Sequence, residues 1–221
     1  MIIKAKPLPI TFIKWGALLL IWFFRKRFNK MILNDIEIKP GHSYLLMSNH
    51  FGFLDGFFAY YLCFKYIDKK QKLGGLYTMS VKKQMEKNWW LKYCGSFSVD
   101  PGKRSVQESL EYAAELLNTP GNILLYYPQG NLESTHIRYI EFKDGIFEIV
   151  NQIKGNCQLI WSSNITEYFE STKPSAYFNL LDCGTNKDFD FDSLKKKVNE
   201  HHLQSMRKTV RFTKEPGNLT Y

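Results

Sequence analysis

Short apolar runs alternate with longer stretches of helical pattern along most of this chain, from about residue 43 onward. The apolar runs predict strands at 43–48, 75–80, 96–100, 122–127, 157–163 and 176–182. The stretches between them predict helices at 55–67, 81–94, 105–118 and 143–154. Alternation of this kind predicts an α/β fold, with a central, mostly parallel sheet flanked by helices.

The last part of the chain is polar from about Asp188, and it predicts one further helix at 191–207 and a frayed tail from Lys208 on. No internal repeat, low-complexity tract or second domain is evident, and a length of 221 residues suits one domain. We therefore expect an α/β domain over 36–221, preceded by a distinct amino-terminal segment over 1–35.

This amino-terminal segment contains an apolar run at 8–24 whose one charged residue is Lys14, and Arg25, Lys26 and Arg27 follow it at once. The run is shorter than the roughly 20 residues that span a bilayer. The basic residues suit an anionic cytoplasmic leaflet, so we predict a helix lying on, or embedded in, the cytoplasmic face of a membrane. A short transmembrane anchor and a buried core helix are the alternatives. A signal peptide is disfavoured, because the basic residues follow the apolar run.

The formal net charge is +9, from 30 Lys and Arg against 21 Asp and Glu. This excess favours an anionic partner, such as a phospholipid surface or a phosphorylated cofactor, and the alternative is a solvated basic surface. A nucleic acid is disfavoured, because no zinc-finger spacing or RNA-binding aromatic signature accompanies the charge. Aromatic residues make up 16% of the chain, and some rings are expected to face lipid or an acyl chain.

The cysteines are far apart, at Cys63, Cys94, Cys157 and Cys183, and they form no CxxC motif. Such spacing predicts free thiols in a reducing compartment. The adjacent His201 and His202 lie in the polar tail and do not make a metal site by themselves. We therefore expect no metal.

The run 48–55 contains a His followed five residues later by an Asp, His50 and Asp55. Such a pair suits a general base and the carboxylate that orients it. On one helix, side chains five residues apart point about 140° apart, so these two meet only if the chain turns, and Gly52 makes that turn easy. The pair is expected in a loop at a strand end, where functional residues often lie. The alternative is a His that caps the helix or bonds a backbone carbonyl.

Three further segments, each at the end of a predicted strand or the start of a predicted helix, carry groups that could act together with His50 and Asp55. The run 126–131 follows an apolar strand, and its Pro-x-Gly turn exposes backbone amides suited to a carbonyl or an oxyanion. The run 95–100 ends a strand and leads into Lys103 and Arg104, and 142–147 starts a helix.

In these segments the chain resembles the glycerolipid acyltransferases, the lysophosphatidate acyltransferase-like family. The family's blocks are Asn-His-x4-Asp, Gly-x4-Asp-Arg, Phe-Pro-Glu-Gly-Thr-Arg and Phe-Lys-x-Gly. The matching segments, in the same order, are 49–55, 95–100, 127–132 and 142–145. Order and spacing agree from about residue 43 to 150, and a hydrophobic amino-terminal segment is also usual. The resemblance implies that His50 and Asp55 are catalytic and that Asn49, Gln129 and Gly130 bind substrate.

The departures from the family concern the second and third blocks, which are associated with the phosphate of a glycerol-phosphate acceptor. Pro101 replaces the Arg of the second block, and Gln129 and Leu132 replace the Glu and Arg of the third. The Val-Pro that usually begins the next strand is also missing. Cations that are candidate substitutes for binding the acceptor are Lys103, Arg104 and Lys143. The alternative for each is a solvated surface charge.

The resemblance implies a membrane-associated O-acyltransferase that moves a fatty acyl group from acyl-CoA or acyl carrier protein to a lyso-lipid hydroxyl in membrane lipid biosynthesis. No cofactor is expected beyond this acyl thioester. The lack of a GxSxG elbow and of a Cys-His signature agrees with direct transfer. Three hypotheses stay open: a phosphorylated acceptor such as a lysophospholipid, a non-phosphate acceptor such as a lyso-aminolipid, and a catalytically silent lipid-binding protein. The altered Arg and Glu positions favour the second hypothesis more than the family resemblance alone does.

Overall fold

The centre of the molecule is a seven-stranded sheet in the order β1-β7-β6-β2-β5-β3-β4. The structure is a computed structural model, and it describes residues 1–169 and 171–209. The strands are β1 (Met31–Leu33), β2 (Ser43–Ser48), β3 (Gly75–Val81), β4 (Ser96–Val99), β5 (Asn122–Tyr126), β6 (Cys157–Glu167) and β7 (Ser175–Thr185). All pairs of neighbouring strands are parallel except β6 and β7, so β1 and β7 run opposite to the other five. The predicted α/β fold with a mostly parallel sheet is confirmed.

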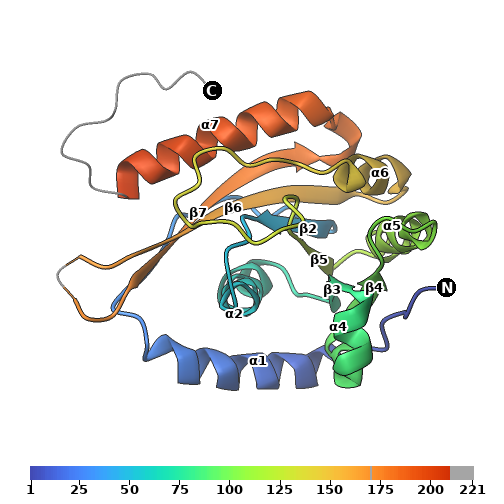
Figure 1. The fold of residues 1–221 in the computed structure, drawn as a ribbon, viewed down its shortest axis with the longest axis horizontal. Coiled ribbons are helices and arrows are strands. Elements are labelled where there is room, and N and C mark those ends of the chain that lie inside the picture. Colours follow the sequence, from blue (N-terminus) through green and yellow to red (C-terminus); the bar gives the residue numbers. More distant parts are fainter. Residues whose placement is uncertain (170, 210–221) are drawn as a thin grey trace.

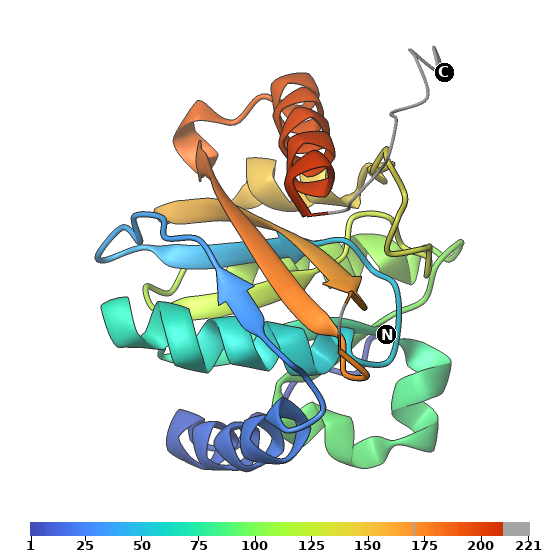
Figure 2. The same ribbon diagram turned by 90° about the vertical axis from the view of Figure 1, so that its left-hand side faces the viewer.

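Helices cover both faces of this sheet (Figure 1). They are α1 (Ile10–Arg25), α2 (Asp55–Tyr61), the π-helix η1 (Leu62–Ile67), α3 (Asp68–Lys70), α4 (Lys82–Lys87), the 3-10 helix η2 (Trp89–Cys94), α5 (Ser105–Leu116), α6 (Gly145–Gln152), the 3-10 helix η3 (Asn186–Asp188) and α7 (Phe191–Thr209). One core lies between the sheet and α1, α2 and η1, and a second lies between the sheet and α5, α6 and α7. Figure 2 shows this layering, with α1 outermost beyond α2.

The central strand β2 shows why the apolar runs lack a polar face. Tyr44 and Leu46 point into the core with α1 and α2, while Leu45 and Met47 point into the core with α5 to α7. Side chains alternate between the faces of a strand, so a strand covered on both sides is apolar throughout. All of β2 is buried.

Gly95 lies between η2 and β4, and its backbone conformation requires a glycine. Its φ is +88°, a region that L residues rarely adopt. A Cβ there would also lie 1.9 Å from the carbonyl oxygen of Leu76 on β3. This glycine therefore lets the chain turn closely against β3 and enter the sheet.

Helix α1 has one buried side and one exposed apolar side. Ile13, Ala17 and Ile21 face the core, and Lys14 is turned toward α3, where its Nζ lies 2.5 Å from Oδ2 of Asp68. Burial raises the pKa of Asp68, but the hydrogen bond from Lys14, the Leu73 amide and the charge of Lys72 outweigh it, so the pKa lies below its ordinary value. The charge of Lys14, the one charged residue in the apolar run, is thus balanced by Asp68 on the side of α1 that faces the protein.

The outer side of α1 carries a stripe of large apolar side chains. This stripe consists of Phe12, Trp15, Leu19, Trp22 and Phe23, each more than half exposed. Within residues 1–169 and 171–209, no helix has the length and apolar character needed to cross a bilayer.

Several element boundaries differ from those predicted. The helix predicted at 55–67 continues to Lys70, and the one predicted at 81–94 is divided at Asn88 into α4 and η2. The three-residue β1 was not predicted, because so short an edge strand has no detectable alternation. Lys208 still belongs to α7, and most of the predicted tail lies outside the described residues. The four cysteines are free thiols.

Candidate active site

The predicted site residues follow the carboxyl ends of parallel strands at one edge of the sheet. His50 follows β2, Gln129 follows β5 and Lys103 follows β4. In open α/β sheets, ligands bind in the crevice outside these strand ends. Parallel topology therefore places at one edge segments that are far apart in the sequence.

His50 and Asp55 form a hydrogen-bonded pair, with 2.5 Å between Nδ1 and Oδ2. The turn between them also directs the N–H groups of Phe51 and Gly52 to Oδ2 of Asp55, at 2.8 and 2.9 Å. Because a carboxylate only accepts hydrogen bonds, we assign the ring proton to Nδ1, which leaves Nε2 with its lone pair free. The His50 side chain is 30% exposed while that of Asp55 is 2% exposed, so the base is accessible and its partner is not.

The second oxygen of this carboxylate differs from the first. Oδ1 of Asp55 is buried and has no hydrogen-bond partner among the described residues. Oδ2 alone accepts the three hydrogen bonds. The turn is therefore organised around a single carboxylate oxygen.

Asn49 fixes the position from which His50 projects. Its Nδ2 donates to the carbonyl of Asn164 on β6, and its Oδ1 accepts from the N–H of the same residue, both at 2.8 Å. The Asn49 side chain is buried and both its polar atoms are occupied. The structure thus gives Asn49 a role in joining the end of β2 to β6, and its predicted contact with substrate stays a prediction.

Gln129 binds the backbone of His50 from the neighbouring strand end. Its Oε1 accepts from the N–H of His50 at 2.8 Å, and its Nε2 donates to a carboxylate oxygen of Glu133. The N–H of Glu133 in turn donates to the carbonyl of His50 at 2.9 Å. The family's Glu at this position could not make the second of these bonds, because a carboxylate has no hydrogen to donate.

The model of the family described as "Acyltransferase" matches residues 29–160, more than half of the chain. The chain belongs to the acyltransferase family. It is also similar to the crystal structure of the 1-acyl-sn-glycerophosphate (LPA) acyltransferase PlsC from Thermotoga maritima, with a TM-score of 0.54 and 14% sequence identity. That match covers 92% of this chain and 81% of the other, and at this identity it shows the fold alone. No curated protein matches.

The turn after β5 in this acyltransferase uses the amide of Gly130 internally. Gly130 has a φ of +70°, and its N–H donates to the carbonyl of Tyr127 at 3.2 Å. The Gly130 amide is therefore engaged within the turn, whereas Asn131 and Leu132 are exposed and their amides have no protein acceptor in the described part of the chain.

The three candidate cations have different surroundings. Lys143 lies against Gly130, and its Nζ is 3.4 Å from a carboxylate oxygen of Glu141. The Nζ of Lys103 is 3.0 Å from Oδ2 of Asp100, and its side chain is 70% exposed. Arg104 is exposed, and it has no acidic partner among the described residues.

Lys103 and Arg104 are also displaced from the His50 pair along the sheet. They follow β4, which lies three strands from β2 in the order β2-β5-β3-β4. Neighbouring strands are about 4.8 Å apart, so the two strand ends are separated by roughly 14 Å. The structure brings Asn49, Gln129 and Gly130 to the His50 pair and leaves these two cations farther along the same edge.

Two residues near His50 were not singled out from the sequence. The ring of Tyr127 stacks on that of His50, with 4.4 Å between centroids and 25° between planes. Burial raises the pKa of the Tyr127 phenol, and the charge of Asp55 adds to this effect. The position of Tyr127 in the third block was a usable signal, whereas nothing in the sequence indicated that Glu133 returns to the His50 backbone.

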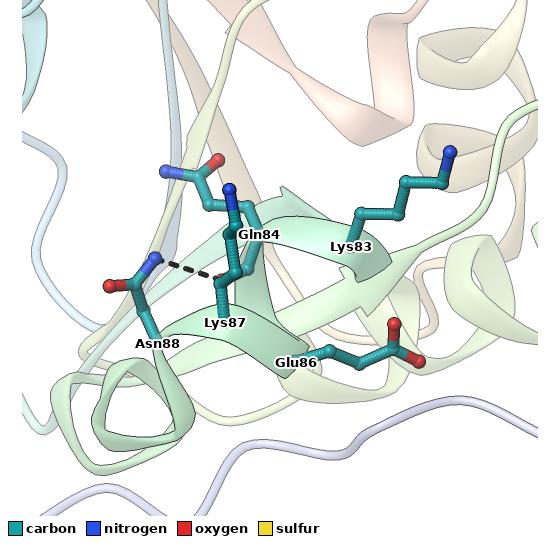
Figure 3. A pocket seen from close by; sticks show the side chains of 5 residues that line it. All are labelled: Lys83, Gln84, Glu86, Lys87 and Asn88. Atoms are coloured by element: carbon teal, nitrogen blue, oxygen red, sulfur yellow. Dashed lines mark hydrogen bonds between the residues drawn. The ribbon is translucent and has the colours of Figure 1, made fainter.

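A pocket on α4 is lined by Lys83, Gln84, Glu86, Lys87 and Asn88 (Figure 3). Within it, Nδ2 of Asn88 donates to the carbonyl of Gln84 at 3.1 Å. None of the residues that surround His50 line this pocket. It is a charged hollow beside η2 and not a part of the candidate active site.

Proposed function

We propose that this acyltransferase moves a fatty acyl group from an acyl thioester to a hydroxyl group of a lyso-lipid, with His50 as general base. The observation that carries the proposal is the His50–Asp55 pair, in which a buried carboxylate binds Nδ1 and the accessible Nε2 has no protein partner among the described residues. An unactivated alcohol loses its proton only far above neutral pH, so a base aligned with the hydroxyl assists its attack.

The proposed step transfers one proton and exchanges one bond. Nε2 of His50 takes the proton of the acceptor hydroxyl as its oxygen attacks the thioester carbonyl. Asp55 stabilises the imidazolium that forms, and the C–S bond then breaks while the thiolate takes the proton back from Nε2. The free amides of Asn131 and Leu132 are suited to the oxyanion that forms in between. Acyl-CoA and acyl carrier protein both supply such a thioester, and no other cofactor is needed.

A specific observation favours an acceptor without a phosphate as the second candidate. Just after the third block, the Glu133 carboxylate accepts from the Gln129 side chain, one position beyond the place where the family has Arg, and Leu132 at that place is exposed. Lys103 and Lys143 each face a carboxylate of their own. Since a phosphate dianion would meet this negative charge, a lyso-aminolipid or another lipid-linked hydroxyl fits the site at least as well as a lysophospholipid.

We also propose that the exposed side of α1 rests on the anionic cytoplasmic face of a membrane. The stripe of Phe12, Trp15, Leu19, Trp22 and Phe23 lies along one side of the helix. An exposed patch of this kind marks an interaction site, and aromatic rings beside basic residues suit the lipid headgroup region.

Basic residues at the end of α1 support the same orientation. Lys26 Nζ lies 3.9 Å from the centroid of the Trp22 ring, and the Arg27 guanidinium lies 5.6 Å from that of Phe23. Cations that follow an apolar stripe attract anionic headgroups while the rings enter the interface.

The helix η2 extends this surface beyond α1. The N–H groups of Lys6 and Leu8 donate to the carbonyls of Lys92 and Tyr93, so η2 lies beside the chain that enters α1. The exposed Trp89 and Trp90 of η2 are 65% and 50% accessible. Two lysines, Lys83 and Lys87, line the adjacent pocket on α4 (Figure 3).

The test of acyl transfer offers the purified protein a panel of phosphorylated and unphosphorylated lyso-lipids with labelled acyl-CoA and acyl carrier protein. His50→Ala is expected to lower kcat by roughly 10³-fold, which is within the range for loss of a general base. His42→Ala is the matched control, because His42 is a partly exposed histidine just before the same strand. Equal activity of the two variants would refute the role of His50. Lack of product with every acceptor, from a folded protein, would favour the lipid-binding hypothesis.

The test of membrane contact is flotation with vesicles of phosphatidylcholine alone or with phosphatidylglycerol added. Trp15→Ser with Trp22→Ser is expected to reduce binding to the anionic vesicles by about tenfold or more, since each buried aromatic side chain contributes more than 1 kcal/mol. Tyr139→Ser serves as control, because Tyr139 is 60% exposed but lies in the β5–α6 loop. Unchanged binding of the double variant would refute the proposed contact.

A further inference from the structure

The chain between β5 and α6 forms a loop whose two ends are joined. The N–H of Lys143 donates to the carbonyl of Pro128 at 2.9 Å. Residues 128–143 therefore leave the sheet and return to the same place, as compact surface loops do. Gln129 and Glu133 lie in the first part of this loop and contact the backbone of His50.

The second part of the loop is held by α7. Nε2 of His202 donates to the carbonyl of Ile137 at 2.8 Å. Asn199, one turn earlier on α7, accepts from the N–H of Ile140 at 2.6 Å and donates to its carbonyl at 3.1 Å. One helix thus satisfies three backbone groups of a loop that has no regular structure of its own.

His202 is itself held in one orientation, and its hydrogen bonds fit the neutral ring. Its side chain is fully buried, and its Nδ1 is 3.0 Å from Oγ of Ser163. The Trp161 indole N–H donates to the same Oγ at 2.8 Å, so the serine hydroxyl donates to Nδ1, and Nε2 carries the ring hydrogen. Burial lowers the pKa of His202, and its neighbour His201 lowers it further. The neutral ring is thus suited to a permanent bond with Ile137.

We infer that His202 and Asn199 of α7 are positioning residues for the active-site loop 128–143. This inference rests on the proposed function, because the loop carries Gln129 and the amides offered to the reacting carbonyl. The family model ends at residue 160, before α7, so the anchoring is built by a part of this chain outside the matched region. The loop is held between α7 on one side and the His50 backbone on the other.

The test compares two adjacent histidines in the full-length protein. His202→Phe keeps a ring against Trp161 but removes the bond to Ile137, while His201→Phe removes a similar 2.9 Å bond to the carbonyl of Asn179 on β7. We expect kcat to fall roughly tenfold in His202→Phe with the KM of the donor unchanged, and to stay near wild type in His201→Phe. His202→Gln retains an N–H donor at the same distance along the side chain and is expected to restore most of kcat. Equal losses in the two Phe variants would overturn the inference.

Hydrogen exchange supplies a second readout that does not depend on acyl transfer. In His202→Phe, and in Asn199→Ala should the first variant fail to fold, the amides of Glu133 and Ile140 are expected to exchange at least tenfold faster. The amides of β2 and β5 are expected to stay as protected as in the wild type. Faster exchange throughout the molecule, or faster loop exchange with unchanged kcat, would overturn the inference. A wild-type protein inactive on all acceptors would refute the proposed function and leave the anchoring to be decided by exchange.

Discussion

The ends of β2 and β4 lie at the same edge of the sheet but are built in opposite ways. At the end of β2, Asn49, Asp55 and Gln129 are buried, and nearly all their polar atoms have partners. At the end of β4, Lys103 and Arg104 are exposed. The geometry near His50 is therefore fixed by buried hydrogen bonds, whereas the cations beyond β4 have exposed side chains, and Lys103 has only an ion pair with Asp100. The difference indicates that the fold holds the proposed base pair more rigidly than the two candidate cations that follow β4.

The largest effect is expected from Asp55, which organises the β2 end. Asp55→Ala removes the acceptor of three hydrogen bonds and should lower kcat by about 10³-fold. In Asp55→Asn, the amide oxygen can take the place of Oδ2, and the NH2 group takes the place of the unpartnered Oδ1. The His50 tautomer is then kept and only the charge is lost, so we expect a loss of about 10²-fold. Steady-state kinetics of both variants decide this, and an Asn variant as inactive as Ala would show that the tautomer is not preserved.

A smaller effect is expected from introducing the family's typical residue at Gln129. In the wild type, Nε2 of Gln129 donates to the carboxylate of Glu133. Gln129→Glu places a second carboxylate at this position, next to that of Glu133. We expect kcat to fall roughly tenfold and the melting temperature to drop, because like charges repel and a hydrogen bond is lost. The exchanged pair, Gln129→Glu with Glu133→Gln, restores one donor and one acceptor and should recover most of both quantities. Failure of the exchanged pair to recover would show that the two side chains are not coupled.

The pH dependence of stability tests whether the two neighbouring histidines of α7 are buried as neutral rings. Burial lowers the pKa of both His201 and His202 from the ordinary value of 6.5. The unfolded chain therefore binds more protons than the folded one just below pH 6.5, and stability falls as the pH decreases through that range. Each histidine contributes at most about 1.4 kcal/mol per pH unit. Melting curves from pH 7.5 to 5 should show a weaker pH dependence in His202→Gln, and an unchanged slope would contradict the neutral buried ring.

The smallest effects are expected at the β4 end. Lys103→Ala breaks an exposed ion pair with Asp100, worth about 0–1 kcal/mol, and should change the melting temperature by no more than about 2–4 °C. With an unphosphorylated acceptor, Lys103→Ala and Arg104→Ala should keep kcat/KM within about threefold of wild type. A loss above tenfold that is confined to phosphorylated acceptors would show that these cations bind phosphate, and would remove the contrast between the two strand ends.

Much of the architecture was predictable from local pattern. Central strands such as β2 are buried on both faces and therefore appear as continuous apolar runs, and α5 and α6 follow from their helical pattern. The His50–Asp55 pair was also predictable, because both residues lie within one short turn. The edge strand β1 was not, since it is too short to show alternation and forms only by pairing with the distant β7, and nothing in the local pattern marked the break between α4 and η2.

The sequence by itself determined the fold class, the family and the residues that can act as base and partner, because these depend on short-range spacing and on the order of blocks. Only the tertiary structure decided that Gln129 and Glu133 join the His50 backbone, that Lys14 turns inward to Asp68, and that α7 holds the loop 128–143. These contacts link residues that the chain brings together only when strands of the sheet align and helices cover its faces. His202 shows the difference most clearly, since a histidine in a polar stretch of sequence becomes fully buried once the apolar side of α7 packs on β6 and β7.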